Sequence, residues 1–241
     1  MRDAVYEAMA HDETVHWWFL GRRRILQSVL EWLSLPHHAR ILEIGAGTGG
    51  NIPLLSCFGT VTAVEPNPRA RAWIAEKTGL AAVDCKLPDV KPLRDAQFDL
   101  IAMLDVLEHI EDATGTLRAL SRHLASGGRF LVTVPAYRFL WSSHDESLQH
   151  FRRYTRRTLA ATVAEANLSV VRMRYFNTLL FPAVAAVRFV LNVVGAKSID
   201  EVRVPPSPIN AVLATLFSAE RHFVLTAPMP FGVSLLAVLE R

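Results

Sequence analysis

The stretch ILEIGAGTGG, residues 41–50, places a glycine-rich loop directly after a short apolar run that predicts a β-strand. Two patterns fit this loop. One is G-x-G-x-x-G, which ends at Gly50 and is typical of a dinucleotide site. The other is E-x-G-x-G-x-G, which starts at Glu43, ends at Gly49 and indicates a different nucleoside ligand. In both, glycines let a ligand approach the backbone amides at the start of the following helix.

The charge around the loop separates the two ligands. A dinucleotide brings a doubly negative pyrophosphate, which a carboxylate at the strand end repels, whereas S-adenosylmethionine carries a positive sulfonium and a positive ammonium. Glu43 suits the cationic ligand, and no Lys or Arg lies between Ile41 and Val64 to bind a phosphate. The residues therefore favour S-adenosylmethionine over a nicotinamide dinucleotide.

The segments around the loop alternate between strand-like and helix-like patterns. Short strand-like runs lie at Arg40–Ile44, Thr60–Val64, Leu80–Val83, Phe98–Leu104 and Arg129–Val134, with helices such as Pro68–Lys77 and Ala113–Ala125 between them. This alternation predicts an α/β fold with a doubly wound, mostly parallel sheet.

Helical patterns also occupy two segments outside this alternation. Residues 1–35, which contain HWWFLGRRRIL, predict an N-terminal helical cap. A helix at Thr158–Ala166 and a strand at Ser169–Tyr175 follow the core, and Gly232–Glu240 predicts the last strand. The intervening residues 176–231 far exceed a hairpin loop of about two to five residues, so they predict an inserted helical subdomain within a single domain, 1–241.

Composition excludes several classes of protein. The net charge is only +3, too low for a nucleic-acid groove. The two cysteines, Cys57 and Cys85, have no metal-ligand spacing, so neither a metal nor a disulfide framework is expected. The N-terminus lacks the basic and apolar regions of a signal peptide, and the expected location is the cytoplasm.

Three further predicted strand ends carry residues suited to a nucleoside ligand. Glu65 ends the second strand, where a carboxylate accepts both ribose hydroxyls. Asp84 follows the third predicted strand, where an adenine amino group would lie. Leu104 and Asp105 lie at the tip of the fourth predicted strand, next to the first strand in a sheet of this order.

The ordered set EIGAGTGG, AVEPN, FDLI and LDVLEH resembles the class I S-adenosylmethionine-dependent methyltransferases, and is similar to the branch that includes the ubiquinone-biosynthesis O-methyltransferases. The resemblance covers residues 41–134 and implies a seven-stranded sheet whose last strand is antiparallel. It places Glu65 on the ribose, Asp84 and Cys85 beside the adenine, and Asp105 near the methionine end. The predicted cofactor-binding set is Glu43, Gly45, Ala46, Gly47, Gly49, Glu65, Pro66, Asp84, Cys85, Leu104 and Asp105.

Two histidine-bearing segments are candidates for acceptor chemistry, because a hydroxyl acceptor benefits from a general base. His109 follows the fourth predicted strand. The segment after the fifth, residues 135–154, contains the other two candidate bases, His144 and His150. The predicted acceptor-binding residues are Trp18, Asp145, Arg152, Arg153 and Tyr154. The alternative is a purely structural role, in which these groups only fix a long loop and dock the N-terminal helix.

Residues 176–196 form an apolar run, but Pro182, Arg188 and Asn192 interrupt it, so a buried or interfacial helix is expected rather than a membrane span. A small or lipid-like acceptor, with O-methylation favoured and peripheral membrane contact through residues 176–196, is the preferred prediction. A nicotinamide-dependent oxidoreductase and a non-catalytic cofactor-binding scaffold stay open as alternatives. The sequence does not determine the oligomeric state.

Overall fold

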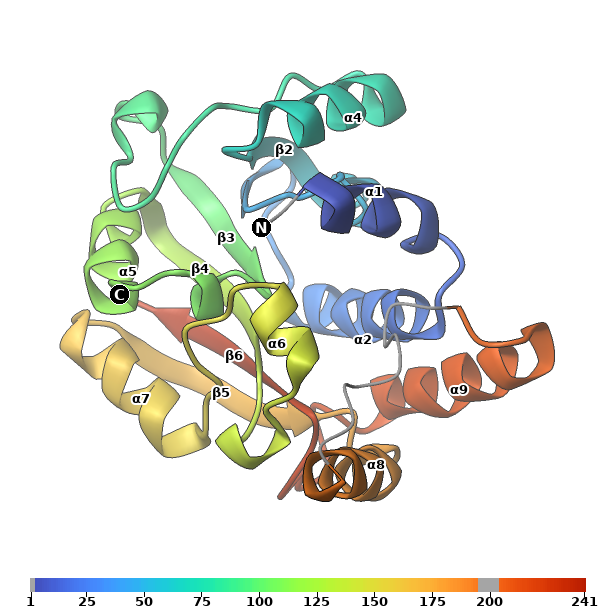
Figure 1. The fold of residues 1–241 in the computed structure, drawn as a ribbon. Helices are drawn as coiled ribbons and strands as arrows, with labels where there is room; N and C mark the ends of the chain where they lie inside the picture. Colours follow the sequence, from blue (N-terminus) through green and yellow to red (C-terminus); the bar gives the residue numbers. More distant parts are fainter. Residues whose placement is uncertain (1–2, 195–203) are drawn as a thin grey trace.

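The computed structural model describes residues 3–194 and 204–241, and its centre is one mixed β-sheet (Figure 1). The strands are β1 (Ala39–Ile44), β2 (Gly59–Val64), β3 (Phe98–Leu104), β4 (Leu124–Pro135), β5 (Ser169–Phe176) and β6 (Ser234–Glu240). The strand order is β2-β1-β3-β4-β6-β5. The parts of the predicted cap, insertion and membrane-contact segment that fall on residues 1–2 and 195–203 lie outside the described residues.

The sheet confirms the predicted doubly wound architecture and corrects its strand count. β1 pairs in parallel with β2 and β3, β3 pairs in parallel with β4, and β6 is antiparallel to both β4 and β5. The described residues form six strands, not the seven predicted, because Leu80–Val83 is not a strand. Only Val83 pairs with the sheet, through an isolated parallel bridge to Val64. The two alanines before it offer no β-branched side chain to pack on the sheet.

Helices cover both faces of this sheet. They are α1 (Asp3–Asp12), α2 (Trp17–Leu33), α3 (Ile52–Ser56), α4 (Pro68–Thr78), α5 (Ala113–Ser121), α6 (Ser143–Ser147), α7 (Arg156–Glu165), α8 (Phe181–Val193) and α9 (Ser207–Ala219). One core cluster joins α5 and α7 to one face, for example through Leu117 and Leu159. A second joins α2 and α9 to the other face, for example through Ile25 and Phe217.

The predicted helix Ala113–Ala125 is too long at its C-terminal end. α5 ends at Ser121, and the chain enters β4 at Leu124, which is buried and pairs with Phe98. A register shift follows, in which Gly127 has a φ of +74°. The glycine pair that predicted a helix stop therefore forms an irregularity inside a strand, where sheet pairing of Leu124 overrides local helix propensity.

The N-terminal helices and the segment between β5 and β6 pack against each other, although they are far apart in the sequence. Gly21 lies in the middle of α2, and a Cβ there would lie 2.4 Å from Cδ1 of Phe217 on α9. Trp17 meets the same phenylalanine ring edge-on, with centroids 5.8 Å apart. Asn210 of α9 accepts a hydrogen bond from the Trp17 amide and donates one to Val15. These contacts hold α2 and α9 side by side on one face of the sheet (Figure 1).

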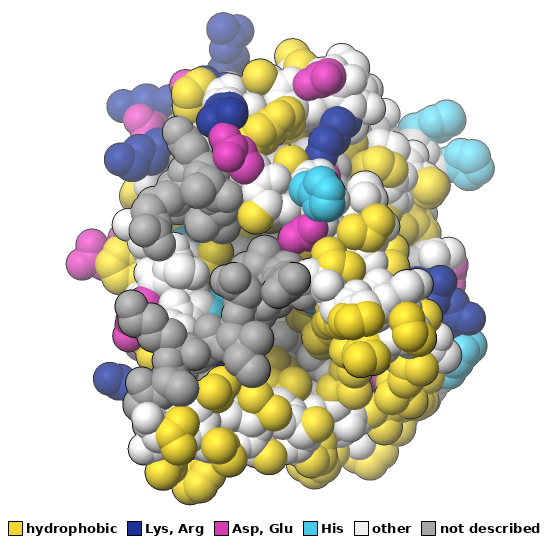
Figure 2. Space-filling view, turned by 45° about the vertical axis from the view of Figure 1, so that its right-hand side comes forward, with side chains coloured by type: hydrophobic (Ala, Val, Ile, Leu, Met, Phe, Trp, Pro, Cys, Tyr) yellow, Lys and Arg dark blue, Asp and Glu magenta, His cyan; other side chains and the backbone are white. Residues whose placement is uncertain are grey.

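α8 follows β5 and exposes much of its apolar surface. Val187, Phe189, Val190 and Val193 are between 53% and 70% exposed. Hydrophobic side chains gather over the lower part of the face shown in Figure 2, where α8 and α9 lie. Among the described helices, none combines the length and the hydropathy needed to cross a membrane.

Candidate active site

A cavity of about 1700 Å³ lies over the carboxyl ends of β1, β2, β3 and β4. In a parallel sheet these ends are where ligands bind, because loops at each strand end converge there. The loops after all four strands line the cavity, and helices α1, α2 and α8 add residues from outside the sheet. Most of the predicted site residues lie in these loops.

The glycine loop after β1 adopts a conformation that larger residues disfavour. Gly45 has a φ of +65°, and a Cβ on it would lie 2.7 Å from Cγ2 of Val106. Gly50 also lines the cavity, and a Cβ there would lie 2.4 Å from Oε2 of Glu13, which follows α1. A carboxylate this close to the glycine that would complete a dinucleotide pattern disfavours a pyrophosphate at that position. Ala46 and Gly47 line the cavity, whereas Gly49 packs against Ile74 beneath the loop.

Glu43 lies at the end of β1 as predicted, but its side chain does not reach the cavity. Its side chain is buried, with 1% exposure, and does not line the cavity. Asn51, which does line the cavity, donates a hydrogen bond to Oε1 of Glu43 at 3.1 Å. Within the described part of the chain, Oε2 of Glu43 has no partner. Burial raises the pKa of Glu43 to about 7. Any influence of Glu43 on a ligand is therefore transmitted through Asn51.

Glu65 lies at the tip of β2 and lines the cavity as predicted. It accepts hydrogen bonds from the Gly47 amide at 2.9 Å, from the Asn67 amide at 2.9 Å and from the Tyr6 hydroxyl at 3.1 Å. Burial raises the pKa of its carboxyl group, and these hydrogen bonds oppose that rise. A carboxylate has about four acceptor positions, so three bonds leave capacity for a ribose hydroxyl.

Of the two residues predicted to lie beside the adenine, only Cys85 lines the cavity. Cys85 is buried and lines the cavity, and burial raises the pKa of its thiol. Asp84 is exposed, forms a 3.0 Å ion pair with Arg71 and does not line the cavity. Pro66 and Leu104 line the cavity on either side of this region.

Asp105, at the tip of β3, faces a buried arginine that the predicted site did not include. Asp105 has a φ of +61°, a conformation uncommon for residues other than glycine and associated with functional sites. NH1 of Arg22 donates a hydrogen bond to Oδ2 of Asp105, and NH2 donates one to Asn51. The Arg22 guanidinium lies 4.5 Å from the centroid of the Trp18 ring. None of the described residues accepts a hydrogen bond from its Nε.

Helix α1 and the turn that follows it border the cavity beside Glu65. Tyr6 of α1 and Glu13 of the turn line the cavity. Glu13 accepts hydrogen bonds from the Thr48 hydroxyl and from Lys77, each at 2.6 Å. Glu7 forms an ion pair with Arg69 at 2.6 Å. No short motif marks these residues in the sequence, because their partners are distant and α1 gives only a weak helical pattern.

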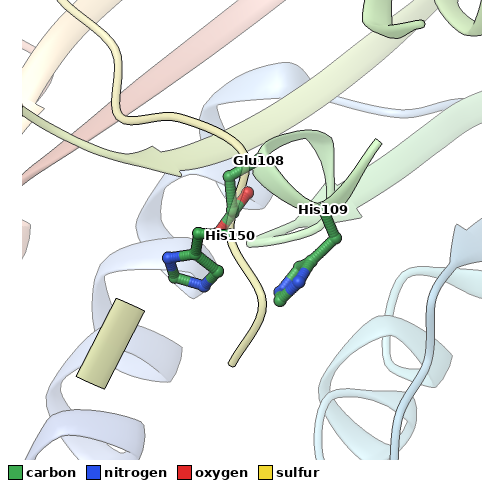
Figure 3. Close-up of side chains that lie close together, drawn as sticks. All are labelled: Glu108, His109 and His150. Atoms are coloured by element: carbon green, nitrogen blue, oxygen red, sulfur yellow. The ribbon is translucent and has the colours of Figure 1, made fainter. Parts of the chain in front are cut away.

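A group of titratable side chains lines the cavity beyond Asp105 in the sequence. Glu108 and His109 follow β3, and His150 comes from the loop after α6; Figure 3 shows the three grouped together. The His109 and His150 rings are perpendicular, with centroids 4.6 Å apart. Burial, and then the neighbouring His150, lowers the pKa of His109 to about 3, so this imidazole is neutral at physiological pH. Burial, and then Asp105, raises the pKa of Glu108 well above its usual value.

Asp145 orients His150. Nδ1 of His150 lies 2.8 Å from Oδ1 of Asp145, and Nε of Arg153 donates to the same oxygen at 2.7 Å. Burial alone would raise the pKa of Asp145, but the hydrogen bonds from His150 and Arg153 outweigh it and hold the pKa well below its usual range. Asp145, predicted to bind the acceptor, is fully buried and does not line the cavity; it pairs with His150 and Arg153 instead.

The other predicted acceptor residues occupy different positions. Trp18, His144 and Arg153 line the cavity. Arg152 donates a hydrogen bond to the backbone carbonyl of Glu111 and does not line the cavity. Tyr154 is buried in the core and does not reach the cavity. The positions of these two residues agree with the alternative of a purely structural role.

The wall nearest to the histidines comes largely from α8. Leu180, Val184 and Val187 face the cavity together with Arg188. Arg188 is buried, and its NH1 donates to the backbone carbonyl of Leu140 at 2.5 Å. An arginine that interrupts an apolar helix thus points inward, toward the cavity, rather than outward along an interface.

Comparisons with known proteins agree with this geometry. A family model described as a methyltransferase domain matches residues 18–173. The ubiquinone biosynthesis O-methyltransferase of Methylocella silvestris is 32% identical over 155 residues, which cover 54% of this chain and 58% of that enzyme. The chloroplastic tocopherol O-methyltransferase of Arabidopsis thaliana is 26% identical over 118 residues, 46% of this chain and 34% of that protein. The match therefore spans less than two thirds of either relative. The crystal structure of a SAM-dependent methyltransferase from Archaeoglobus fulgidus superposes with a TM-score of 0.58 at 15% identity, over 96% of this chain and 98% of that one.

Proposed function

The chain belongs to the methyltransferase-domain family and uses S-adenosylmethionine; on that premise we propose that it methylates a hydroxyl oxygen of a small, largely apolar acceptor. When bound, the cofactor supplies a methyl group on a positively charged sulfur, which keeps the electron pair of the broken bond. The chain's own residues must hold the cofactor, orient the acceptor, exclude water and take the hydroxyl proton.

The residues around the glycine loop fit this cofactor. Gly45 and Gly47 line the cavity at positive φ, and without side chains they leave the backbone open to a ligand. We assign the ribose hydroxyls to Glu65, whose carboxylate lies in the cavity. We assign the cofactor's carboxylate to Arg22, a buried cation whose Nε has no acceptor among the described residues. Asp105, already beside Arg22, would face the ammonium.

The single observation that supports a small acceptor in the same site is the size and continuity of the cavity. Ligand pockets are typically about 300–1000 Å³. At about 1700 Å³ the cavity has room for a second molecule beside the cofactor. The same cavity reaches from Glu65 to His150 and α8, so both reactants would share one enclosed space.

We assign the general base to His150. Its Nδ1 is committed to Asp145 at 2.8 Å, which leaves Nε2 to accept a proton from the acceptor hydroxyl. The Asp145 carboxylate would stabilise the imidazolium that forms, and Arg153 keeps that carboxylate in place. His109 contributes a neutral ring beside the base. An arrangement built around a base favours O-methylation, in which a proton must leave the acceptor.

The apolar wall supports a lipid-like acceptor. α8 lines the cavity with Val184 and Val187 and exposes Phe189, Val190 and Val193 on its other side. The relatives are named for ubiquinone biosynthesis and for tocopherol, which supports an apolar acceptor as well. We further propose that this exposed face contacts a membrane surface peripherally, so that an acceptor dissolved in lipid enters beside α8.

Two competing functions have less support. A nicotinamide-dependent oxidoreductase would need the third glycine for a pyrophosphate, but Gly50 packs under Glu13. A non-catalytic scaffold would not need an oriented His150–Asp145 pair. Neither function appears among the comparisons reported above.

The test uses purified protein, radiolabelled S-adenosylmethionine and a series of phenols whose alkyl tails differ in length. We expect label in a methyl ether, with KM falling up to about fourfold for each methylene that becomes buried. Matched anilines should give little product. Transfer to the anilines but not to the phenols would contradict O-methylation, and a KM independent of tail length would contradict an apolar acceptor pocket.

Liposome flotation tests the membrane contact separately. The wild-type protein should float with lipid vesicles, and the double variant Phe189→Ser and Val193→Ser should float less while methylating a short water-soluble phenol at the wild-type rate. Equal flotation of both proteins, or no flotation of either, would contradict contact through α8.

A further inference from the structure

Glu108, His109 and His150 form a compact group of side chains of the kinds that bind metal ions. The three residues provide one carboxylate oxygen and two imidazole nitrogens, and these ligand atoms all lie within 4.8 Å of one another (Figure 3). All three residues line the cavity. Glu108 and His109 are adjacent in the sequence, but His150 is supplied by a different loop, so no metal-ligand spacing reveals the set.

Glu108 has an unsatisfied oxygen in this group. The residue is 1% exposed, and its Oε2 has no hydrogen-bond partner anywhere in residues 3–194 or 204–241. Buried polar atoms are almost always paired, so an orphaned carboxylate oxygen beside two imidazoles requires an explanation. A cation between the three side chains would provide the missing partner.

The surrounding hydrogen bonds orient both imidazoles as metal ligands require. Histidines that bind metals usually donate their other ring N–H to a carboxylate or a backbone carbonyl. Nδ1 of His150 lies 2.8 Å from Oδ1 of Asp145. His109 forms a hydrogen bond with the backbone of Leu148. Each ring therefore has one nitrogen fixed by the protein and one left over.

We propose that Glu108, His109 and His150 bind one divalent first-row transition-metal ion, such as Zn²⁺, Mn²⁺ or Fe²⁺, with open coordination positions facing the acceptor end of the cavity. Two imidazoles with one carboxylate suit these ions better than Mg²⁺ or Ca²⁺, which prefer oxygen ligands. Three protein ligands leave positions for a substrate. Bonds of about 2.1 Å hold tetrahedral ligand atoms about 3.4 Å apart, so small side-chain rotations close the site.

An ion in this place would change how the acceptor loses its proton, a consequence that rests on the proposed O-methylation. A coordinated hydroxyl has a much lower pKa than a free one. His150 would then act as a ligand, and the proton would pass to water. If His150 is the base, Glu108→Gln should keep its turnover, because the His150–Asp145 pair stays intact. If His150 is a metal ligand, the same variant should lose turnover, because it lacks another ligand of the ion.

Metal binding is tested without turnover. Chelator-treated protein is titrated with Co²⁺, whose visible d–d absorption reports imidazole and carboxylate coordination, and Zn²⁺ then displaces it. We expect one tight site per chain, weakened at least about tenfold in Glu108→Gln and in His150→Asn. The control His37→Ala and His38→Ala removes an exposed histidine pair and should leave the site unchanged. Calorimetry with S-adenosylhomocysteine shows that each variant is folded.

The outcomes separate the metal site from the proposed function. Absence of d–d absorption, or its loss only in the His37 and His38 control, overturns the metal site. Full turnover of chelated protein and of Glu108→Gln also overturns it, yet leaves His150 as the base and the proposed function intact. Tight Co²⁺ binding with no methylation of any acceptor confirms the metal site and contradicts the proposed function.

Discussion

The two ends of the cavity are built on different principles. The cofactor end has short, dense polar contacts: Glu65 accepts three hydrogen bonds, and Arg22 bridges Asp105 and Asn51. The acceptor end has an apolar wall from α8 with one compact polar group around His150. The cofactor end lies on loops directly after β1, β2 and β3, whereas α8 comes from the segment between β5 and β6.

This difference indicates a division of roles. Many fixed hydrogen bonds select one ligand, because each unsatisfied polar group is costly. An apolar wall selects only approximate shape and size, since one methylene changes affinity by about 1–3 kcal/mol or less. Substitution of a single polar residue at the cofactor end should therefore weaken cofactor binding. At the acceptor end, only substitutions in the group around His150 should lower the rate of methyl transfer.

The strongest test of this division is His150→Gln, which removes the proposed base. We expect kcat to fall about 10²- to 10⁴-fold, the usual contribution of a general base, while the Kd for S-adenosylhomocysteine stays within about twofold. Timed methylation assays measure kcat, and calorimetry measures the Kd. His123→Gln is the control, because His123 is also buried but hydrogen-bonds to the backbone of Ala96 and does not line the cavity. Equal loss of cofactor affinity and of kcat in His150→Gln would show that the two ends are not separable.

The second test concerns the backbone of the cofactor end. Gly45→Ala adds a left-handed strain of about 1–2 kcal/mol and an overpacking term of about 1–3 kcal/mol against Val106. The free variant can relieve this strain by moving the loop, and a bound cofactor would have to force the loop back; at 1.4 kcal/mol per tenfold, cofactor affinity should therefore fall by up to about 3000-fold. Gly79→Ala is a matched control, because Gly79 has a φ of +71° but nothing within 4 Å of its Cβ position. That variant should lose only stability. Equal cofactor affinity in both variants would mean that close approach to Gly45 is irrelevant.

A larger share of the residues predicted for the cofactor than of those predicted for the acceptor lines the cavity, for a physical reason. Glycine loops and strand-end acids are local, so Gly45, Glu65 and Asp105 could be placed from strand patterns alone. Glu43 was predicted at the right strand end, but its burial behind Asn51 depends on packing that no spacing encodes.

The contacts that sequence reasoning missed all join distant segments. Arg22 was absent from the predicted site, because its partner Asp105 lies 83 residues away. The seven-strand prediction failed at residues 80–83, where only Val83 reaches the sheet. The inward orientation of Arg188 depends on Leu140, which also lies in a separate loop.

The third test uses the titration of Glu43. Burial raises the pKa of Glu43 to about 7, so the folded protein holds a proton that the unfolded chain releases near pH 4.5. Its contribution to stability is complete below about pH 4.5, is lost as pH rises towards 7 and is constant above. The loss amounts to about 3 kcal/mol, at about 1.4 kcal/mol for each pKa unit.

Glu43→Gln removes this titration. In urea unfolding of the cofactor-free protein, the stability of the variant relative to wild type should increase by about 2–3 kcal/mol between pH 5 and pH 8. Glu76→Gln, on the exposed face of α4, should show no such change. A stability difference that is the same at both pH values would mean that Glu43 is not protonated in the folded protein at pH 5.

The smallest expected effect is that of an Arg22 substitution on cofactor affinity, and it tests which part of the cofactor Arg22 contacts. Arg22→Gln removes a charge-assisted contact of about 1.5–3 kcal/mol, so the Kd for S-adenosylhomocysteine should rise about 10- to 100-fold. 5′-Methylthioadenosine lacks the amino-acid end of the cofactor and should bind the variant and the wild type alike. Arg24→Gln, which loses a hydrogen bond to Ser218 of α9, controls for the loss of a helix arginine and should change neither affinity. If Arg22 merely held α2 in place, both ligands would weaken together, because the glycine loop and Glu65 would shift with the helix; a loss confined to the longer ligand requires a direct contact between Arg22 and its carboxylate.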